Sequence, residues 1–148
     1  MGERKIWSVG RQQVRILLDT CTIIYVTEKK RLKPNLVALI DEAAQQGQLW
    51  VSLISAWEIG MLASKGKLPL TKNPTDYFET FLREADARIC RIDAAIMIGS
   101  HYLPGKLHGD PMDRLLIESA RNCDLTLVTR DRAILAYGAQ GHVKTLAC

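Results

Sequence analysis

The stretch VRILLDT, residues 14–20, decides the fold because an apolar run ends abruptly at a carboxylate. Its apolar residues follow one another without alternation, which is typical of a strand buried on both faces of a parallel sheet. The stretch therefore predicts a central strand with Asp19 at its carboxyl end. Further strands are expected at residues 49–52, 87–92, 124–129 and 142–146.

Between these strands, apolar residues return at helical spacing. Residues 36, 39, 40 and 43 share one face and precede Gly47, as in an amphipathic helix that ends at a glycine. Strands that alternate with helices predict an α/β sandwich with a mostly parallel sheet. In the strand at 87–92, Ile89 and Ile92 are expected to face inward. Helices are expected at residues 35–47, 55–67, 73–85, 93–103, 110–123 and 131–138.

The composition fits one soluble domain with a basic excess. A chain of 148 residues is most simply a single domain, assigned here to residues 14–148, with residues 1–13 as a basic N-terminal extension. The net charge of +4 permits a polyanionic partner, although an ordinary solvated basic surface explains it equally well. No apolar run approaches the roughly 20 residues of a membrane span, and the N-terminus lacks a secretory core. A cytoplasmic protein without a membrane partner is expected.

The cysteines and histidines do not indicate a disulfide framework or a zinc site. None of the four cysteines forms a C-x-x-C pair, which favours reduced thiols in a cytosolic protein. The three histidines show no zinc-type spacing with them.

Five acidic residues stand where the expected strands end or the expected helices begin. In a parallel sheet, these ends meet at one edge, and ligands bind there at the switch in strand order. We therefore expect five carboxylates from four distant segments to converge: Asp19, Glu58, Asp110, Asp113 and Asp131.

Converging carboxylates favour a divalent cation. Ionised groups at close range raise one another's pKa, and a bound cation relieves their repulsion. Mg²⁺ prefers oxygen ligands, activates water and stabilises charge on a phosphodiester. An acidic cluster beside a basic surface therefore indicates a metal-dependent nuclease.

Each carboxylate also has an ordinary structural interpretation. Asp110 followed by Pro111 matches a helix N-cap with proline at the first helical position. The spacing Ser55-x-x-Glu58 matches a capping box, in which the glutamate bonds back to a backbone N–H group. Asp131 is equally compatible with capping its own short helix.

The other two acidic residues, and the threonines beside the acids, also have both a structural and a functional interpretation. Asp19 could instead be a turn residue. Asp113 could instead be an anion that the helix dipole favours in a first helical turn. Thr20 and Thr129 stand beside Asp19 and Asp131. They either orient a carboxylate or a water, or serve only local turn and strand geometry.

Basic and aromatic residues near these acids complete the candidate site. Arg114 has two interpretations, a phosphate ligand and a partner in a surface ion pair. Lys65 and Lys67 are candidates for holding an RNA backbone. Trp57, next to Glu58, is predicted to pack in the core rather than to stack on a base.

Four segments, taken together and in order, resemble the signature blocks of PIN-domain ribonucleases, and especially the VapC-like toxins of bacterial toxin–antitoxin pairs. These segments are ILLDTCTII at 16–24, SAWEIGMLASKGKLPL at 55–70, HGDPMDRLLIESA at 108–120 and LTLVTRDRAI at 125–134. The resemblance spans about residues 15–145. It implies a PIN-like three-layer sandwich and RNA phosphodiester cleavage that depends on Mg²⁺ or Mn²⁺.

The resemblance also implies roles and partners. Asp19, Glu58 and Asp113 correspond to the core acidic residues and Asp131 to the fourth, with Asp19 and Asp113 as the metal ligands. Asp110 corresponds to a companion position that caps the helix. A cognate antitoxin that occludes the site, and a toxin homodimer, are implied as well. Two alternatives stay open, a non-catalytic module that binds RNA or a partner, and a metal-dependent phosphatase of small phosphoesters.

Overall fold

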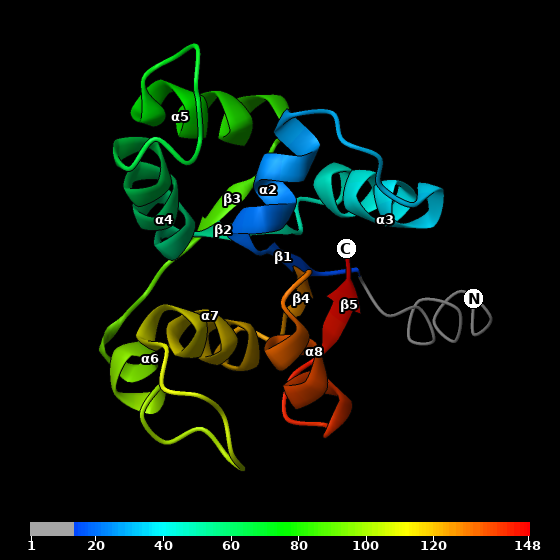
Figure 1. Ribbon diagram of the computed structural model, residues 1–148. Coiled ribbons are helices and arrows are strands. Elements are labelled where there is room, and N and C mark those ends of the chain that lie inside the picture. The colour runs from blue at the N-terminus through cyan, green and yellow to red at the C-terminus, as the bar shows by residue number, and fades with distance from the viewer. Residues whose placement is uncertain (1–13) are drawn as a thin grey trace, which may run out of the picture.

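The computed structural model describes residues 14–148 (Figure 1). The predicted N-terminal extension over residues 1–13 lies outside the described residues. Within residues 14–148, no helix combines the length and the apolar character needed to cross a membrane.

A five-stranded sheet forms the centre of the fold, in the order β3-β2-β1-β4-β5, and every neighbouring pair is parallel. The central position predicted for the first strand is confirmed, and its three residues are buried. The strands are β1 (Ile16–Leu18), β2 (Leu49–Ser52), β3 (Arg88–Cys90), β4 (Thr126–Thr129) and β5 (Thr145–Ala147).

Helices cover both faces of the sheet, which confirms the expected three-layer α/β sandwich. In Figure 1, α2 to α5 lie on one side of the sheet and α6 to α8 on the other. The helices are α2 (Thr20–Thr27), α3 (Pro34–Gln45), α4 (Leu53–Ser64), α5 (Pro74–Glu84), α6 (Ala94–Gly99), α7 (Pro111–Asn122) and α8 (Arg132–Ala139).

The sheet divides the apolar core into two clusters. Because side chains alternate along a strand, Ile16 and Leu18 pack into one cluster while Leu17 packs into the other. The first cluster includes residues of α3 and α5, such as Ile40 and Phe81, and the second includes residues of α7 and α8.

The strand order places a switch point at β1. From β1 the chain builds β2 and β3 on one side, and then crosses to build β4 and β5 on the other. Register pairs Leu18 with Val128, so Asp19 and Thr129 follow neighbouring strands at the same edge. This edge is where ligands bind in open α/β sheets.

The structure adds one helix and corrects two local predictions. The segment after Asp19 forms helix α2, which the sequence did not indicate. Helix α4 begins at Leu53, and the Ser52 side chain accepts from the Ile54 N–H group as its N-cap, so the capping box at Ser55 is wrong. In β3, Ile89 is 38% exposed and Cys90 faces the core instead, because only alternate residues of a strand share a face.

All four cysteines lie within the described residues and are free. The sulfur atoms of Cys90 and Cys123 are 3.7 Å apart, a hydrogen-bonding contact between thiols.

Candidate metal-binding site

Asp19 lies at the centre of the candidate site, at the end of β1 and at the N-cap of α2. The backbone N–H group of Thr20 donates to Oδ1 at 2.7 Å, and the Thr129 hydroxyl donates to Oδ2 at 2.6 Å. The residue is only 8% exposed. The carboxylate of Asp19 is therefore held by a donor at each oxygen and faces the carboxyl edge of the sheet.

Asp131 is joined to Asp19 through Thr129. The backbone N–H group of Asp131 donates to Thr129 Oγ1 at 3.0 Å. The Asp131 carboxylate also accepts from the Ile134 N–H group, as the N-cap of α8. Asp131 thus caps its helix, as one interpretation of the sequence held. It also adds negative charge at the carboxyl edge of the sheet, which we call the acidic edge because Asp19, Glu58, Asp110, Asp113 and Asp131 lie there.

Glu58 enters the site from the second turn of α4 and faces α2. Thr20 Oγ1 lies 2.7 Å from Glu58 Oε1 and 2.9 Å from Ser55 Oγ. The Thr20 hydroxyl has one hydrogen, so its donation to Glu58 leaves the Ser55 hydroxyl to serve as donor to Thr20. Ser55 is fully buried and helps to position Glu58 through its hydrogen bond with Thr20. The sequence did not reveal this role.

Asp110 and Asp113 open helix α7 in two different ways. Asp110 Oδ1 accepts from the N–H groups of Met112 at 2.9 Å and of Asp113 at 3.1 Å, so Asp110 is the N-cap. Asp113 uses no side-chain oxygen in the cap, and its Oδ2 lies 3.4 Å from His108 Nε2. His108 Nδ1 accepts from the Asp110 N–H group, so a neutral His108 carries its hydrogen at Nε2, toward Asp113.

Arg114 supports the loop before α7. Its guanidinium donates to the backbone oxygens of Ser100 at 2.9 Å, of Leu107 at 3.3 Å and of His108 at 3.4 Å. Within residues 14–148, Arg114 forms no ion pair, so the surface ion pair considered from the sequence is wrong. Three backbone carbonyls engage the side chain, which thereby positions His108.

The carboxylates act on one another electrostatically. Burial, followed by the negative charges of Asp110, Asp131 and Asp19, raises the pKa of Asp113 to about 7. Burial likewise raises the pKa of Asp19, with a smaller contribution from Asp131.

The pKa of Glu58 is also raised, chiefly by burial and then by the charges of Asp19 and Asp110. The five predicted acidic residues therefore lie at one edge of the sheet, each within range of the charge of at least two of the others.

The donor chemistry of this edge fits a hard divalent cation. Among residues 14–148, no three His, Cys, Asp or Glu side chains are grouped as the ligands of one ion. Mg²⁺ is commonly held by one or two carboxylates and several waters, which Asp19 and Asp113 could supply. The raised pKa values of the carboxylates reflect burial first and neighbouring negative charge second. A bound cation stabilises the ionised carboxylates against both effects.

Among residues 14–148, no ion pair joins Lys65 or Lys67 to the acidic residues. Lys65 is the C-cap residue of α4 and Lys67 follows it, whereas Glu58 lies in the middle of this helix. Trp57 is 54% exposed, so its predicted core packing is wrong. Glu58 faces α2, and Trp57, the next residue on the helix, is turned toward solvent.

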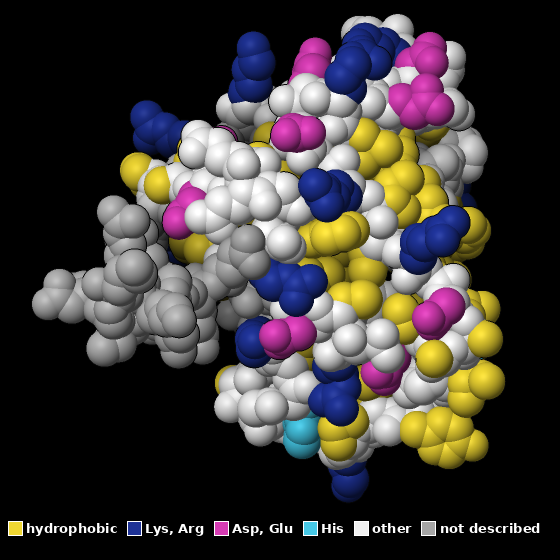
Figure 2. Space-filling view, turned by 180° about the vertical axis from the view of Figure 1, so that it is seen from behind, with side chains coloured by type: hydrophobic (Ala, Val, Ile, Leu, Met, Phe, Trp, Pro, Cys, Tyr) yellow, Lys and Arg dark blue, Asp and Glu magenta, His cyan; other side chains and the backbone are white. Residues whose placement is uncertain are grey.

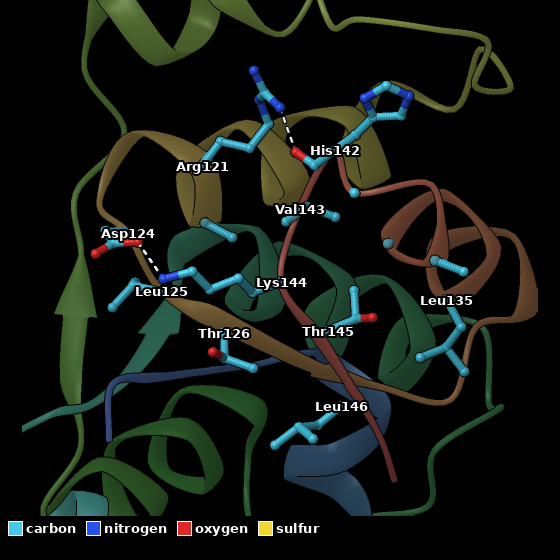
Figure 3. Close-up of a pocket in the computed structure, with 14 residues that line it drawn as sticks. Arg121, Asp124, Leu125, Thr126, Leu135, His142, Val143, Lys144, Thr145 and Leu146 are labelled. Carbon is cyan, nitrogen blue, oxygen red and sulfur yellow. Dashed lines mark hydrogen bonds and ion pairs between the residues drawn. The ribbon is translucent and has the colours of Figure 1, made fainter. Parts of the chain in front are cut away.

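A surface cavity of about 900 Å³ opens at the other end of the strands (Figure 3). Its lining includes Leu125 and Thr126, where β4 begins, and two basic side chains are engaged there. Arg121 donates to the His142 backbone oxygen, and Lys144 donates to Asp124 at 2.6 Å. This cavity is separate from the acidic edge, which lies where β1 and β4 end.

The fold and the site define an α/β protein with an acidic cluster at the switch point of a parallel sheet. The family model of the PIN domain matches residues 16–139, so the chain belongs to the PIN domain family. The resemblance indicated by the four sequence segments is thereby confirmed. No curated protein matches the chain.

Solved structures share the fold. One is the crystal structure of VapBC2 from Rickettsia felis bound to a DNA fragment from their promoter, with 17% identity and a TM-score of 0.68, covering 90% of this chain and 98% of that chain. Another is the crystal structure of FitAcB from Neisseria gonorrhoeae, with 19% identity and a TM-score of 0.55, covering 88% of this chain and 96% of that chain.

Proposed function

We propose that the protein is an endoribonuclease that depends on Mg²⁺ or Mn²⁺ and is the toxin of a toxin–antitoxin pair. The observation that carries this proposal is the convergence of Asp19, Glu58, Asp113 and Asp131 at the switch point of a PIN-domain sheet. Partly buried carboxylates that also repel one another are stabilised by a bound cation, and a cation in such a site can promote phosphodiester hydrolysis.

In this proposal, Asp19 and Asp113 hold the cation, and Glu58 and Asp131 complete the acidic pocket. A bound Mg²⁺ or Mn²⁺ supplies an activated water and stabilises negative charge on the phosphodiester. Thr129 holds Asp19 in orientation through its 2.6 Å hydrogen bond.

On the other side of the pocket, Thr20 holds Glu58 through its 2.7 Å hydrogen bond. Asp110 caps α7 and thereby fixes the start of the helix that carries Asp113. Arg114 fixes the loop next to the same helix.

We also propose two protein partners, a cognate antitoxin and a second copy of this chain. Support for the antitoxin comes from the VapBC2 structure, which is a complex bound to promoter DNA. Support for the homodimer comes from large apolar side chains exposed on α4 and next to or within α6, and Figure 2 shows hydrophobic side chains exposed on this side of the molecule. These side chains are Leu53, Trp57, Met97, Ile98 and Tyr102.

The experiment that tests the activity is cleavage of total cellular RNA by purified, antitoxin-free protein. The protein is incubated with Mg²⁺, with Mn²⁺ or with EDTA, alongside the Asp113→Asn variant. Cuts at a few sites that vanish in EDTA and in the variant support the nuclease. Retention of RNA without cleavage by folded protein supports the binding module instead, and turnover of small phosphoesters unaffected by RNA supports the phosphatase.

A further inference from the structure

A cluster of one aromatic and two basic side chains lies next to the acidic edge. The guanidinium carbon of Arg130 is 4.3 Å from the centre of the Tyr25 ring, and Lys30 Nζ is 5.1 Å from the same centre. Both distances are within the range of cation–π attraction. We call these three residues the Tyr25 cluster; both of its basic residues are exposed to solvent.

The Tyr25 cluster is built from the same elements as the acidic site. Arg130 stands between Thr129, which bonds to Asp19, and Asp131, which caps α8. Tyr25 lies on α2, the helix that Asp19 caps, about 9 Å farther along the helix axis. Helix α2 contacts β4, and this contact brings Tyr25 and Arg130 together.

Arg130 retains hydrogen-bonding capacity for a ligand. A guanidinium has five N–H donors, and one of them donates to the backbone oxygen of Cys148 at 3.3 Å. In the described part of the chain, no aspartate or glutamate side chain forms an ion pair with Arg130. Lys30 contacts Glu28 at 3.5 Å, but an exposed pair of this kind is weak and readily exchanged.

The negative charge of the acidic edge opposes RNA binding, so positive charge nearby would favour it. The acidic edge repels the phosphates of an RNA strand, except where a cation bridges the two. Binding of a strand that passes over Asp19 and Asp113 therefore requires positive charge outside the metal site. Arginine binds phosphate through two parallel hydrogen bonds, and stacking on an aromatic ring fixes the guanidinium plane before the ligand arrives.

We propose that Tyr25, Lys30 and Arg130 form a backbone-binding subsite for single-stranded RNA, one step along the strand from the phosphate at the acidic edge. Arg130 and Lys30 bind phosphate, and Tyr25 positions both cations. The basic run at Lys29, Arg31 and Lys33 continues the positive surface beyond α2. This assignment rests on the proposed function, because it takes RNA as the ligand of the acidic edge.

The test measures RNA binding without cleavage. Full-length protein carrying Asp113→Asn is titrated with a fluorescent single-stranded RNA at several salt concentrations, followed by fluorescence anisotropy. Arg130→Ala is expected to weaken binding about tenfold and to reduce the slope of log K against log salt by about 0.7, the value for one phosphate contact on a single strand. Lys30→Ala is expected to act in the same direction, and Tyr25→Leu more weakly.

The matched control is Arg88→Ala. The Arg88 guanidinium carbon lies 5.8 Å from the Trp50 ring centre, so it makes the same kind of contact. Arg88 is the first residue of β3, at the opposite end of the parallel strands from the acidic edge. Affinity and salt slope are expected to be unchanged in this variant. If Arg130→Ala proves unfolded by circular dichroism, Arg130→Gln serves instead, because it keeps the side-chain length without the charge.

Two outcomes overturn the subsite. In the first, Arg130→Ala binds RNA with the affinity and salt slope of Arg88→Ala. In the second, the Tyr25-cluster variants keep RNA affinity but lose affinity for a polyglutamate peptide, which makes the cluster a docking surface for an acidic protein. Either result can occur while the wild-type protein still cleaves RNA, so failure of the subsite is distinguishable from failure of the nuclease proposal.

Discussion

Thr129 donates its hydroxyl hydrogen to Asp19 across 2.6 Å, although the two residues stand 110 positions apart in the chain. The contact exists because β1 and β4 are parallel neighbours whose register pairs Leu18 with Val128. A hydroxyl at the end of one strand therefore fixes a carboxylate at the end of the other. The orientation of Asp19 depends on the crossing of the chain at β1 rather than on its sequence neighbours alone.

Thr129→Val is expected to weaken metal binding and thereby RNA cleavage. Removal of the donor leaves Asp19 Oδ2 without its shortest hydrogen bond, and such supporting contacts typically change metal affinity by about 10- to 100-fold. The measurement is cleavage rate against Mg²⁺ concentration, where the variant should need more Mg²⁺ for half-maximal rate. Thr22→Val is the matched control, because the buried Thr22 hydroxyl bonds to the Val128 backbone oxygen and to no carboxylate. Equal Mg²⁺ dependence in the two variants would contradict the role of Thr129.

Asp19→Asn is expected to abolish metal-dependent cleavage while the protein remains folded. The amide keeps the shape of the side chain and can still accept from the Thr20 N–H group at the helix cap. It carries no charge to hold a cation. Cleavage of a labelled RNA and circular dichroism are measured together, with Asp41→Asn on the exposed side of α3 as the control. A folded Asp19→Asn protein that cuts RNA at the full rate would show that the metal assignment is wrong.

The strands could be predicted from local sequence pattern, and the convergence of the acidic residues followed from their positions at the ends of parallel strands. An unbroken apolar run such as residues 16–18 has few alternatives to a buried strand, and parallel strands bring their carboxyl ends to one edge. Helix α2 could not be predicted in the same way, since the β-branched residues over Thr20–Thr27 have weak helix propensity. Its helical state follows from the Asp19 cap and from packing against α4 and β4.

The supporting contacts of the site could not be predicted because they join distant segments. The register of α2 against α4 decides that Ser55 meets Thr20, and neither residue signals this alone. Exposure of Trp57 has a similar origin, because α4 carries apolar residues on several sides and only the tertiary structure selects the side that is covered. The cation–π contact between Tyr25 and Arg130 likewise depends on the packing of α2 against β4.

Ser55→Ala is expected to reduce cleavage several-fold through Glu58. Loss of the Ser55 hydroxyl frees Thr20 from one partner and loosens the 2.7 Å contact between Thr20 and Glu58. Because the three groups form one network, Ser55→Ala and Thr20→Val should be non-additive in a double-mutant cycle of kcat/KM. Ser119→Ala is the control, since Ser119 is equally buried in α7 and bonds only to the Leu115 backbone oxygen. Fully additive effects of the two substitutions on kcat/KM would show that Ser55 does not help to position Glu58.

Trp57→Glu is expected to convert a dimer into a monomer. A charge introduced among the exposed apolar side chains of α4 and α6 would be buried without a partner in the proposed interface. Sedimentation velocity at several protein concentrations measures the change. Val37→Glu, at an exposed apolar position on α3, is the control and should leave the association state unaltered. Identical sedimentation of Trp57→Glu and wild type would remove α4 from the interface.

Asp113→Asn is expected to stabilise the metal-free protein at high pH while it destroys metal binding. Burial and neighbouring carboxylates raise the folded-state pKa of Asp113 to about 7, whereas an unfolded aspartate has its ordinary pKa near 3.9. A raised folded-state pKa means that the unfolded state releases its proton first, so stability is fully present below pH 4 and is lost as the pH rises through about 7. Asparagine has no proton to lose, and its amide carries no charge to repel Asp19 and Asp131.

Thermal unfolding in EDTA at pH 5 and pH 8 measures this effect. The wild-type melting temperature should fall between the two values, and it should fall less in Asp113→Asn. Addition of Mg²⁺ at pH 8 should raise the melting temperature of the wild type, because a ligand of the folded state stabilises it, and should leave the variant unchanged. If the melting temperatures of wild type and variant had the same pH dependence in EDTA, the ionisation of Asp113 would not be what destabilises the metal-free protein at high pH.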